Sequence, residues 1–234
     1  MPGLSPPEII LALDVDTLKE ARDFVERLYP KIKIFKVGSR LFTAYGPKAI
    51  ELLHKKGAEV FLDLKYFDIP YTVSGAIEAA VRLKVKMLTL HISGGQAMLE
   101  AAVAAARRQA KALKIARPGL IGVTVLTSEK TNPEKVLALA QQGLACGLDG
   151  VVCSAQEAAA LRRKIKKDFI IITPGIRPDN LDLQDQKRTA TVSEAIKAGS
   201  NFLVMGRPIL KAADPLFQTE ELLGELSCFN RKSV

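Results

Sequence analysis

Residues 9–28 read IILALDVDTLKEARDFVERL, an apolar run followed by a segment of helical period. The aliphatic run fits a buried strand that ends at Asp14. Thr17 and Glu20 have the spacing of a capping box, which marks the start of a helix. The apolar positions on one face of that helix are Leu18, Ala21, Val25 and Leu28. The stretch therefore predicts one strand followed by one helix.

The same unit recurs to the end of the chain. Further apolar runs lie at residues 32–37, 60–64, 87–91, 120–125, 151–153, 169–173 and 202–205. Each run precedes a segment of helical period, and no linker or low-complexity stretch interrupts the alternation. Eight strand–helix units in 234 residues are typical of parallel strands closed into a (β/α)8 TIM barrel, so we expect one such domain over residues 1–234. A doubly wound open sheet is the alternative.

Composition limits the classes of partner. The chain has 34 Lys and Arg against 25 Asp and Glu, a net charge of +9 that would attract anions. Nucleic-acid binding is disfavoured, because the lysines are spread along the predicted helices and the chain has no Trp and four Tyr to stack on bases. Three cysteines without C-x-x-C spacing and two histidines favour free thiols over a disulfide or a zinc site. Since no apolar run approaches the roughly 18 residues of a membrane span, we expect a soluble cytoplasmic protein with no membrane partner.

Charged residues end the third predicted strand, in FLDLKYFDIP at residues 61–70. Alternation along a strand places Asp63 and Lys65 on one face and the leucines on the other. Charged side chains at the carboxyl ends of barrel strands are typically catalytic. The alternative is a buried salt bridge that only supports the fold, but desolvation makes such bridges weak stabilisers. Asp68, just beyond, also favours a functional cluster.

The first two strands supply further charges. Lys36 lies between Phe35 and Val37, and a lysine in an apolar strand needs a partner or water. Its natural partners are Asp14 and Asp63. Asp14 could cap the following helix, but Thr17 is the better placed cap, so we expect Asp14 to contact a ligand.

The last two strands predict an anion site. Pro174-Gly175-Ile176-Arg177 follows the seventh strand and Met205-Gly206-Arg207-Pro208 follows the eighth. These are the loops in which barrels commonly bind phosphate, through backbone N–H groups and a guanidinium. Either arginine alone could be a solvated surface charge. The polar segment 175–191 has the length and position of a lid over such a site.

Seven motifs together carry a family resemblance. They are Ala12-Leu13-Asp14, Lys36-Val37-Gly38, Asp63-x-Lys65-x-x-Asp68-Ile69-Pro70-x-Thr72, Leu126-Thr127-Ser128, Pro174-Gly175-Ile176-Arg177, Asp185-Gln186-x-Arg188 and Gly206-Arg207. Nearly the whole chain thereby resembles orotidine 5′-monophosphate decarboxylases of the bacterial type. D-x-K-x-x-D alone is shared with sugar-phosphate barrels, whereas D-I-P-x-T, P-G-I-R and D-Q-x-R narrow the resemblance. It implies a (β/α)8 homodimer that works without a cofactor or metal.

The resemblance also implies the reaction, the last step of UMP biosynthesis. Loss of CO2 from the orotate ring leaves a carbanion at C6 that no π system delocalises. Lys65 would stabilise this charge and then protonate C6. Lys36, Asp63 and Asp68 would complete an alternating charge array. Asp68 and Thr72 would come from the neighbouring subunit, so that the active sites are shared.

The remaining roles implied by the resemblance concern substrate binding. Asp14 and Lys36 would hold the ribose hydroxyls. Thr127 would lie near the pyrimidine edge, and Gln186 would bridge the lid to the base and the phosphate. The phosphate ligands would be Arg177, Arg207 and the Gly206 amide.

Two other functions compete with this one. A magnesium-dependent sugar-phosphate decarboxylase or aldolase would share D-x-K-x-x-D, but those relatives carry an acidic residue on the second strand, where this chain has Lys36. A phosphate-ligand or nucleic-acid binder is suggested by charge alone. Such a binder would have no need of the four-residue charge array.

Overall fold

The computed structural model describes residues 6–126, 132–177 and 189–232. Eight parallel strands form a closed barrel in sequence order, with β1 paired to both β2 and β8. The strands are β1 (Glu8–Ala12), β2 (Ile34–Gly38), β3 (Glu59–Tyr66), β4 (Met87–His91), β5 (Gly119–Val123), β6 (Gly150–Val152), β7 (Ile170–Pro174) and β8 (Phe202–Met205). The predicted TIM barrel is therefore confirmed, and the open-sheet alternative is wrong.

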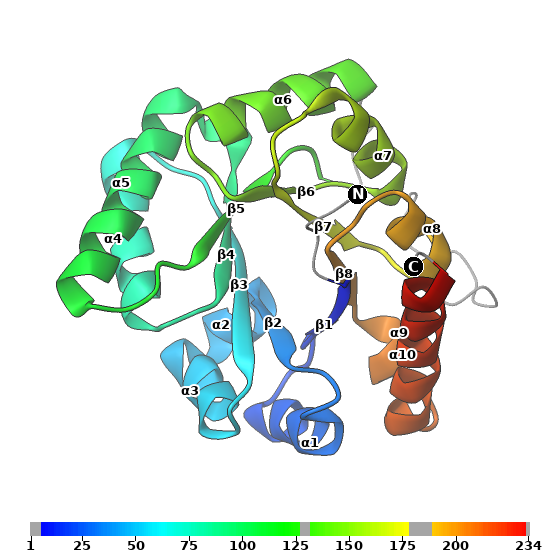
Figure 1. Ribbon diagram of the computed structural model, residues 1–234. Coiled ribbons are helices and arrows are strands. Elements are labelled where there is room, and N and C mark those ends of the chain that lie inside the picture. The colour runs from blue at the N-terminus through cyan, green and yellow to red at the C-terminus, as the bar shows by residue number, and fades with distance from the viewer. Residues whose placement is uncertain (1–5, 127–131, 178–188, 233–234) are drawn as a thin grey trace.

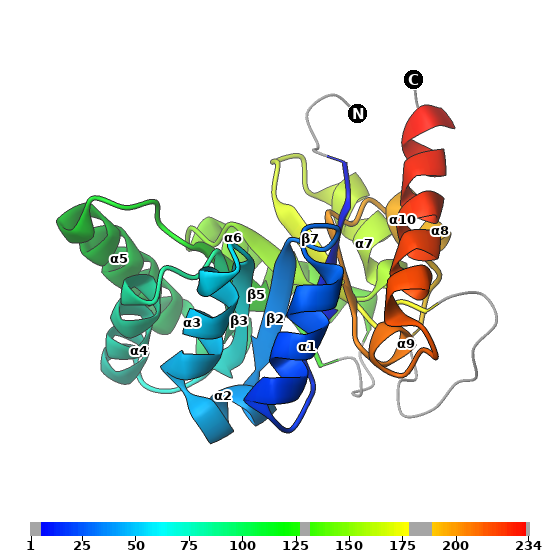
Figure 2. The ribbon, with the colours of Figure 1, turned by 90° about the horizontal axis from the view of Figure 1, so that it is seen from below.

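Helices surround the barrel (Figure 1). They are α1 (Leu18–Leu28), α2 (Ser39–Tyr45), α3 (Pro47–Lys55), α4 (Pro70–Arg82), α5 (Gln96–Leu113), α6 (Pro133–Ala145), α7 (Ala155–Lys164), α8 (Val192–Lys197), α9 (Arg207–Leu210) and α10 (Pro215–Lys232), with a short 3₁₀ turn η1 (Ile92–Gly94). Figure 2 shows α10 beside α1, where Arg27–Asp214 and Lys31–Glu220 ion pairs link the two ends of the chain. The ring of helices is closed at that point.

The first strand–helix unit forms as its sequence predicts. The Thr17 hydroxyl accepts the Glu20 N–H at 3.1 Å, and the Glu20 carboxylate accepts the Thr17 N–H at 3.0 Å. This reciprocal cap fixes where α1 begins. The positions that α1 then buries are Ala21, Val25 and Leu28.

Side chains alternate between two apolar layers along each strand. The inner layer fills the barrel and consists of Ile10, Ala12, Ile34, Phe61, Met87, Ile121, Ile172 and Val204. The outer layer lies between strands and helices, and on β3 it includes Val60 and Leu62. A strand period of two produces both layers. The filled interior leaves the carboxyl ends of the strands as the place where an inward side chain meets a cavity.

Candidate active site at the carboxyl ends of the strands

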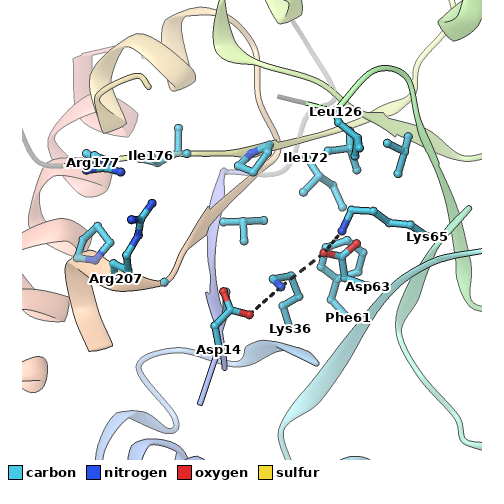
Figure 3. A pocket seen from close by; sticks show the side chains of 18 of the residues that line it. Asp14, Lys36, Phe61, Asp63, Lys65, Leu126, Ile172, Ile176, Arg177 and Arg207 are labelled. Atoms are coloured by element: carbon cyan, nitrogen blue, oxygen red, sulfur yellow. Dashed lines mark hydrogen bonds and ion pairs between the residues drawn. The ribbon is translucent and has the colours of Figure 1, made fainter. Parts of the chain in front are cut away.

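A cavity of about 310 Å³ opens at the carboxyl ends of the strands (Figure 3). Its floor is the inner apolar layer, including Phe61 and Ile172. Its charged residues are Asp14, Lys36, Asp63, Lys65, Arg177 and Arg207. Six of the eleven residues predicted for the site therefore contribute charge to one cavity, and Gly206 also lines it.

Four of these side chains form a connected array. Lys65 Nζ lies 2.8 Å from Asp63 Oδ2, and Lys36 Nζ lies 3.5 Å from the same oxygen. Lys36 Nζ also lies 3.3 Å from Asp14 Oδ1. The side chains of Lys36 and Asp63 are each 12% exposed. Burial of this depth keeps Coulomb attraction strong, and it explains why Lys36 takes two carboxylate partners.

Asp63 is the centre of this array. Burial by itself would raise the pKa of its carboxyl group, but the Lys36 and Lys65 ammonium groups and hydrogen bonds from Lys65 and Thr89 outweigh burial. The pKa of Asp63 therefore lies below its ordinary value. The carboxylate is ionised at neutral pH and holds both lysines.

β3 departs from regular strand geometry at Lys65. The φ angle of Lys65 is +50°, in the left-handed region that residues other than glycine rarely occupy. The pairing with β4 jumps from Leu62 to Tyr66 on β3 while it advances two residues on β4. Such a backbone costs about 1–3 kcal/mol and persists only where its surroundings hold it. The expected alternation is thus wrong in its geometry at Lys65, although Asp63 and Lys65 both reach the cavity.

Gly38, the last residue of β2, gives the Lys36 ammonium its place. A Cβ at Gly38 would lie 3.0 Å from Lys36 Nζ and 3.7 Å from Asp14 Oδ1. A side chain there would be in tight contact with the ammonium, which would have to move by a few tenths of an ångström. The glycine of Lys36-Val37-Gly38 therefore leaves space beside the Lys36 ammonium.

The two arginines lie at the other end of the cavity. Arg177 follows β7 and Arg207 begins α9 after β8, and Figure 3 shows both away from Lys65. Gly175, with a φ of +77°, takes a conformation that favours glycine and turns the chain into this end. Gly206, next to Arg207, also lines the cavity. Two guanidinium groups together with the backbone of Gly206 suit an anion with several oxygens.

The segment 175–191 is described only at its two ends. There, the Arg177 N–H donates to the Ala190 carbonyl oxygen at 3.0 Å, which joins the ends of the segment. Gln186 and Thr127 lie outside the described residues. Their contacts and the lid itself remain predictions.

Asp68 and Thr72 are not in the cavity of their own chain. Both residues are exposed, and neither lines the cavity. One Asp68 carboxylate oxygen accepts the N–H of the next residue at 2.6 Å. Around them lie three large exposed hydrophobic residues, Phe67, Ile69 and Tyr71. Within one chain, three of the four residues predicted for the charge array therefore line the cavity, beside Asp14, and Asp68 does not.

Thr89 supports the site from behind its charged residues and was not predicted from the sequence. This residue of β4 is fully buried, and its hydroxyl contacts both Asp63 and the Lys65 backbone. A polar residue in the apolar run Met87-Leu88-Thr89-Leu90-His91 was the available signal, because a strand period of two sets Thr89 on the same face as Met87, which is in the inner layer.

Neither a metal centre nor a membrane span is found in the described part of the chain. Among residues 6–126, 132–177 and 189–232, no group of three or more His, Cys, Asp or Glu side chains could hold a metal ion. No helix in the same ranges is long and apolar enough to cross a membrane.

The chain is similar to known proteins over most of its length. Residues 7–222 match the model of the orotidine 5′-phosphate decarboxylase / HUMPS family. The chain is 45% identical over 227 residues to orotidine 5′-phosphate decarboxylase of Coxiella burnetii, covering 92% of this chain and 95% of that protein. It is 46% identical over 230 residues to the enzyme of the same name from Trichlorobacter lovleyi, covering 94% and 95%. The crystal structure of orotidine 5′-phosphate decarboxylase from Lactobacillus acidophilus superposes with a TM-score of 0.82 at 34% identity, covering 94% of this chain and 99% of that one.

Proposed function

The chain belongs to the orotidine 5′-phosphate decarboxylase family, and from this premise we infer that it converts orotidine 5′-monophosphate to uridine 5′-monophosphate and CO2. This is the last step of de novo UMP biosynthesis. The observation that carries the inference is the ammonium of Lys65, held 2.8 Å from Asp63 in a cavity whose far end has two arginines. A nucleotide with an orotate ring and a phosphate fits this cavity, with the ring at the Lys65 end and the phosphate at the arginine end.

The substrate lies along the cavity. Arg177, Arg207 and the Gly206 amide bind the phosphate, as anion recognition by guanidinium and backbone N–H groups requires. Asp14 and Lys36 lie between the two ends and bind the ribose hydroxyls. The pyrimidine C6 then faces Lys65.

The reaction breaks one carbon–carbon bond and makes one carbon–hydrogen bond. The bond between C6 and the carboxylate breaks, its electron pair stays on C6, and CO2 leaves. The Lys65 ammonium faces this developing charge and transfers a proton from Nζ to C6. Solvent then restores the proton to the amine. Since the carbanion exists only near the transition state, a preorganised cation stabilises the transition state more than the substrate.

The phosphate contributes to the chemistry without reacting. Its binding energy closes the segment 175–191 over the cavity and excludes water, which strengthens every charge interaction inside. In this proposal Thr127 acts near the pyrimidine edge, and Gln186 bridges the lid to the base and the phosphate. The join between Arg177 and Ala190 supports this proposal, because it gives the segment a fixed base.

A homodimer completes the array. Asp68 and Thr72 of the partner subunit enter the cavity beside Lys65, and the two active sites are shared. Two observations support this arrangement. Asp68 is exposed and does not line the cavity of its own chain. The residues next to it, Ile69 and Tyr71, are 64% and 88% exposed. Large hydrophobic side chains exposed side by side are typical of an interface. We further propose that the enzyme works in the cytoplasm, with no nucleic-acid or membrane partner.

The test is product formation without metal. Purified protein is incubated with orotidine 5′-monophosphate in buffer with excess EDTA, and substrate absorbance and chromatographic UMP are followed. We expect UMP to form at the same rate with and without EDTA, because Lys36 Nζ occupies the space between Asp14 and Asp63 and would repel a divalent cation. Turnover that stops in EDTA and returns with Mg²⁺ would favour a magnesium-dependent sugar-phosphate enzyme instead.

A further inference from the structure

Thr89 makes two hydrogen bonds that meet at one hydroxyl group. The Lys65 backbone N–H donates to Thr89 Oγ1 at 2.9 Å, and the Thr89 hydroxyl donates to Asp63 Oδ1 at 2.9 Å. A hydroxyl has a single proton to donate, and here it goes to a carboxylate that can only accept. The direction of both bonds is therefore fixed. The residue is fully buried, so no water replaces either partner.

The bond to Lys65 compensates for the irregular strand. Between Leu62 and Tyr66, β3 has two more residues than the paired stretch of β4, so backbone groups there lose their regular ladder partners. The Lys65 N–H lies in this stretch, and its φ is +50°. A buried N–H without a partner would disfavour this conformation. The Thr89 hydroxyl supplies the partner.

The bond to Asp63 orients the carboxylate. Asp63 Oδ1 receives the Thr89 hydroxyl, which leaves Oδ2 for the ammonium groups of Lys65 at 2.8 Å and Lys36 at 3.5 Å. One hydroxyl thus fixes the backbone from which the Lys65 side chain extends and also the carboxylate that holds its end.

We propose that Thr89 is a positioning residue for decarboxylation, which holds Lys65 in its left-handed conformation and in contact with Asp63. The inference rests on the proposed function. Thr89 itself does not line the cavity and is not expected to touch the substrate. Its loss should therefore lower kcat and leave nucleotide binding largely unchanged.

The test compares three variants with the wild type. Thr89→Val keeps the size of the side chain and removes the hydroxyl. We expect kcat to fall about 10- to 100-fold, because the hydrogen bond to the Asp63 carboxylate and the one from the Lys65 backbone N–H are both lost. We expect the Kd for UMP to change less than about threefold. Thr89→Ser keeps the hydroxyl and should recover kcat to within about threefold of the wild type. Thr173→Val is the matched control: Thr173 is equally buried on β7, but its hydroxyl bonds to Ser200 outside the cavity, and kcat should stay within about twofold.

A second measurement does not depend on activity. Exchange of the Lys65 amide proton, followed by NMR, should be at least about tenfold faster in Thr89→Val and near the wild-type rate in Thr89→Ser. If Thr89→Val does not fold, Thr89→Ala has the same expected result. The proposal is wrong if the hydroxyl-free variant keeps more than half of the wild-type kcat, if serine does not recover activity, or if the Lys65 amide exchanges at the wild-type rate. A wild-type protein that forms no UMP overturns the proposed function itself, a result distinct from a loss confined to the hydroxyl-free variant.

Discussion

The Lys65 ammonium lies 2.8 Å from the Asp63 carboxylate, and the backbone that joins them is not a regular strand. In a regular strand, two side chains on one face extend in parallel. The left-handed φ of Lys65 instead changes the direction of the chain between the two residues. The catalytic geometry proposed here therefore depends on a local irregularity of β3, and on the groups that keep it in place.

Arg207→Ala should lower kcat/KM for the nucleotide far more than kcat/KM for the nucleoside orotidine. A charge-assisted contact to phosphate is worth about 1.5–3 kcal/mol, so we expect kcat/KM for orotidine 5′-monophosphate to fall about 10- to 100-fold. The value for orotidine should stay nearly constant, because orotidine has no phosphate for the guanidinium to bind. Steady-state kinetics on both substrates measures the difference.

The matched control for this prediction is Arg27→Ala. Arg27 is a surface arginine of α1 that pairs with Asp214. Neither residue lines the cavity, so the loss of Arg27 should affect neither substrate. Equal losses for nucleotide and nucleoside in Arg207→Ala would show that Arg207 supports the fold and does not bind phosphate.

Mixed subunits should reveal whether active sites are shared. Lys65→Ala and Asp68→Asn chains, each inactive alone, are unfolded and refolded together. Half of the random dimers are hybrids, and each hybrid has one intact site of two, so we expect about a quarter of wild-type activity. Mass measurement confirms that hybrids have formed.

The control for the mixing experiment uses two substitutions at residues that the same chain contributes to one active site. Asp63 and Lys65 contact each other within one chain, so a mixture of Asp63→Asn and Lys65→Ala chains damages every site and should stay inactive. If the Lys65→Ala and Asp68→Asn hybrids are also inactive, Asp68 acts within its own chain and the shared-site model fails.

Asp63→Asn should destabilise the protein at neutral pH, by an amount that shrinks in acid. Burial raises the pKa of Asp63, but the lysine ammonium groups and hydrogen bonds outweigh it, so the folded-state pKa lies below the ordinary value of 3.8. The ionised carboxylate then stabilises the folded state at every pH above about 4, and this contribution is lost as pH falls through the folded-state pKa. Urea unfolding of the wild type and of Asp63→Asn, from about pH 7 to about pH 3, measures the difference in their free energies of unfolding. A difference in free energy of unfolding that is constant with pH, or that increases in acid, would contradict the electrostatic role of Asp63.

Much of the fold was predictable because it follows from local chemistry. The reciprocal cap of Thr17 and Glu20 and the apolar runs that became strands are short-range signals, which tertiary packing did not override. The observed strand ends differ from the predicted ones by up to two residues. For example, β3 extends to Tyr66, whereas its predicted apolar run ended at Leu64. Pairing with neighbouring strands, which a single run does not encode, decides such boundaries.

Seven of the residues predicted for the site line one cavity, but the geometry that connects them was less predictable. Charge in an apolar strand was enough to pair Lys36 with Asp14 and Asp63, since burial demands a partner. The left-handed φ of Lys65 was not predictable, because it results from pairing between β3 and β4. Thr89 was missed for the same reason: its partners lie 24 and 26 residues away in the chain.

Lys65→Ala should separate catalysis from nucleotide binding when its turnover is measured beside its affinity for UMP. Lys65 stabilises charge and transfers a proton only during the reaction, so Lys65→Ala should lose nearly all conversion of orotidine 5′-monophosphate in EDTA-containing buffer. Calorimetry should find UMP binding largely intact. If the variant keeps more than about a tenth of wild-type turnover, a loss of less than about 1.4 kcal/mol, Lys65 is not the proton donor and the account is wrong.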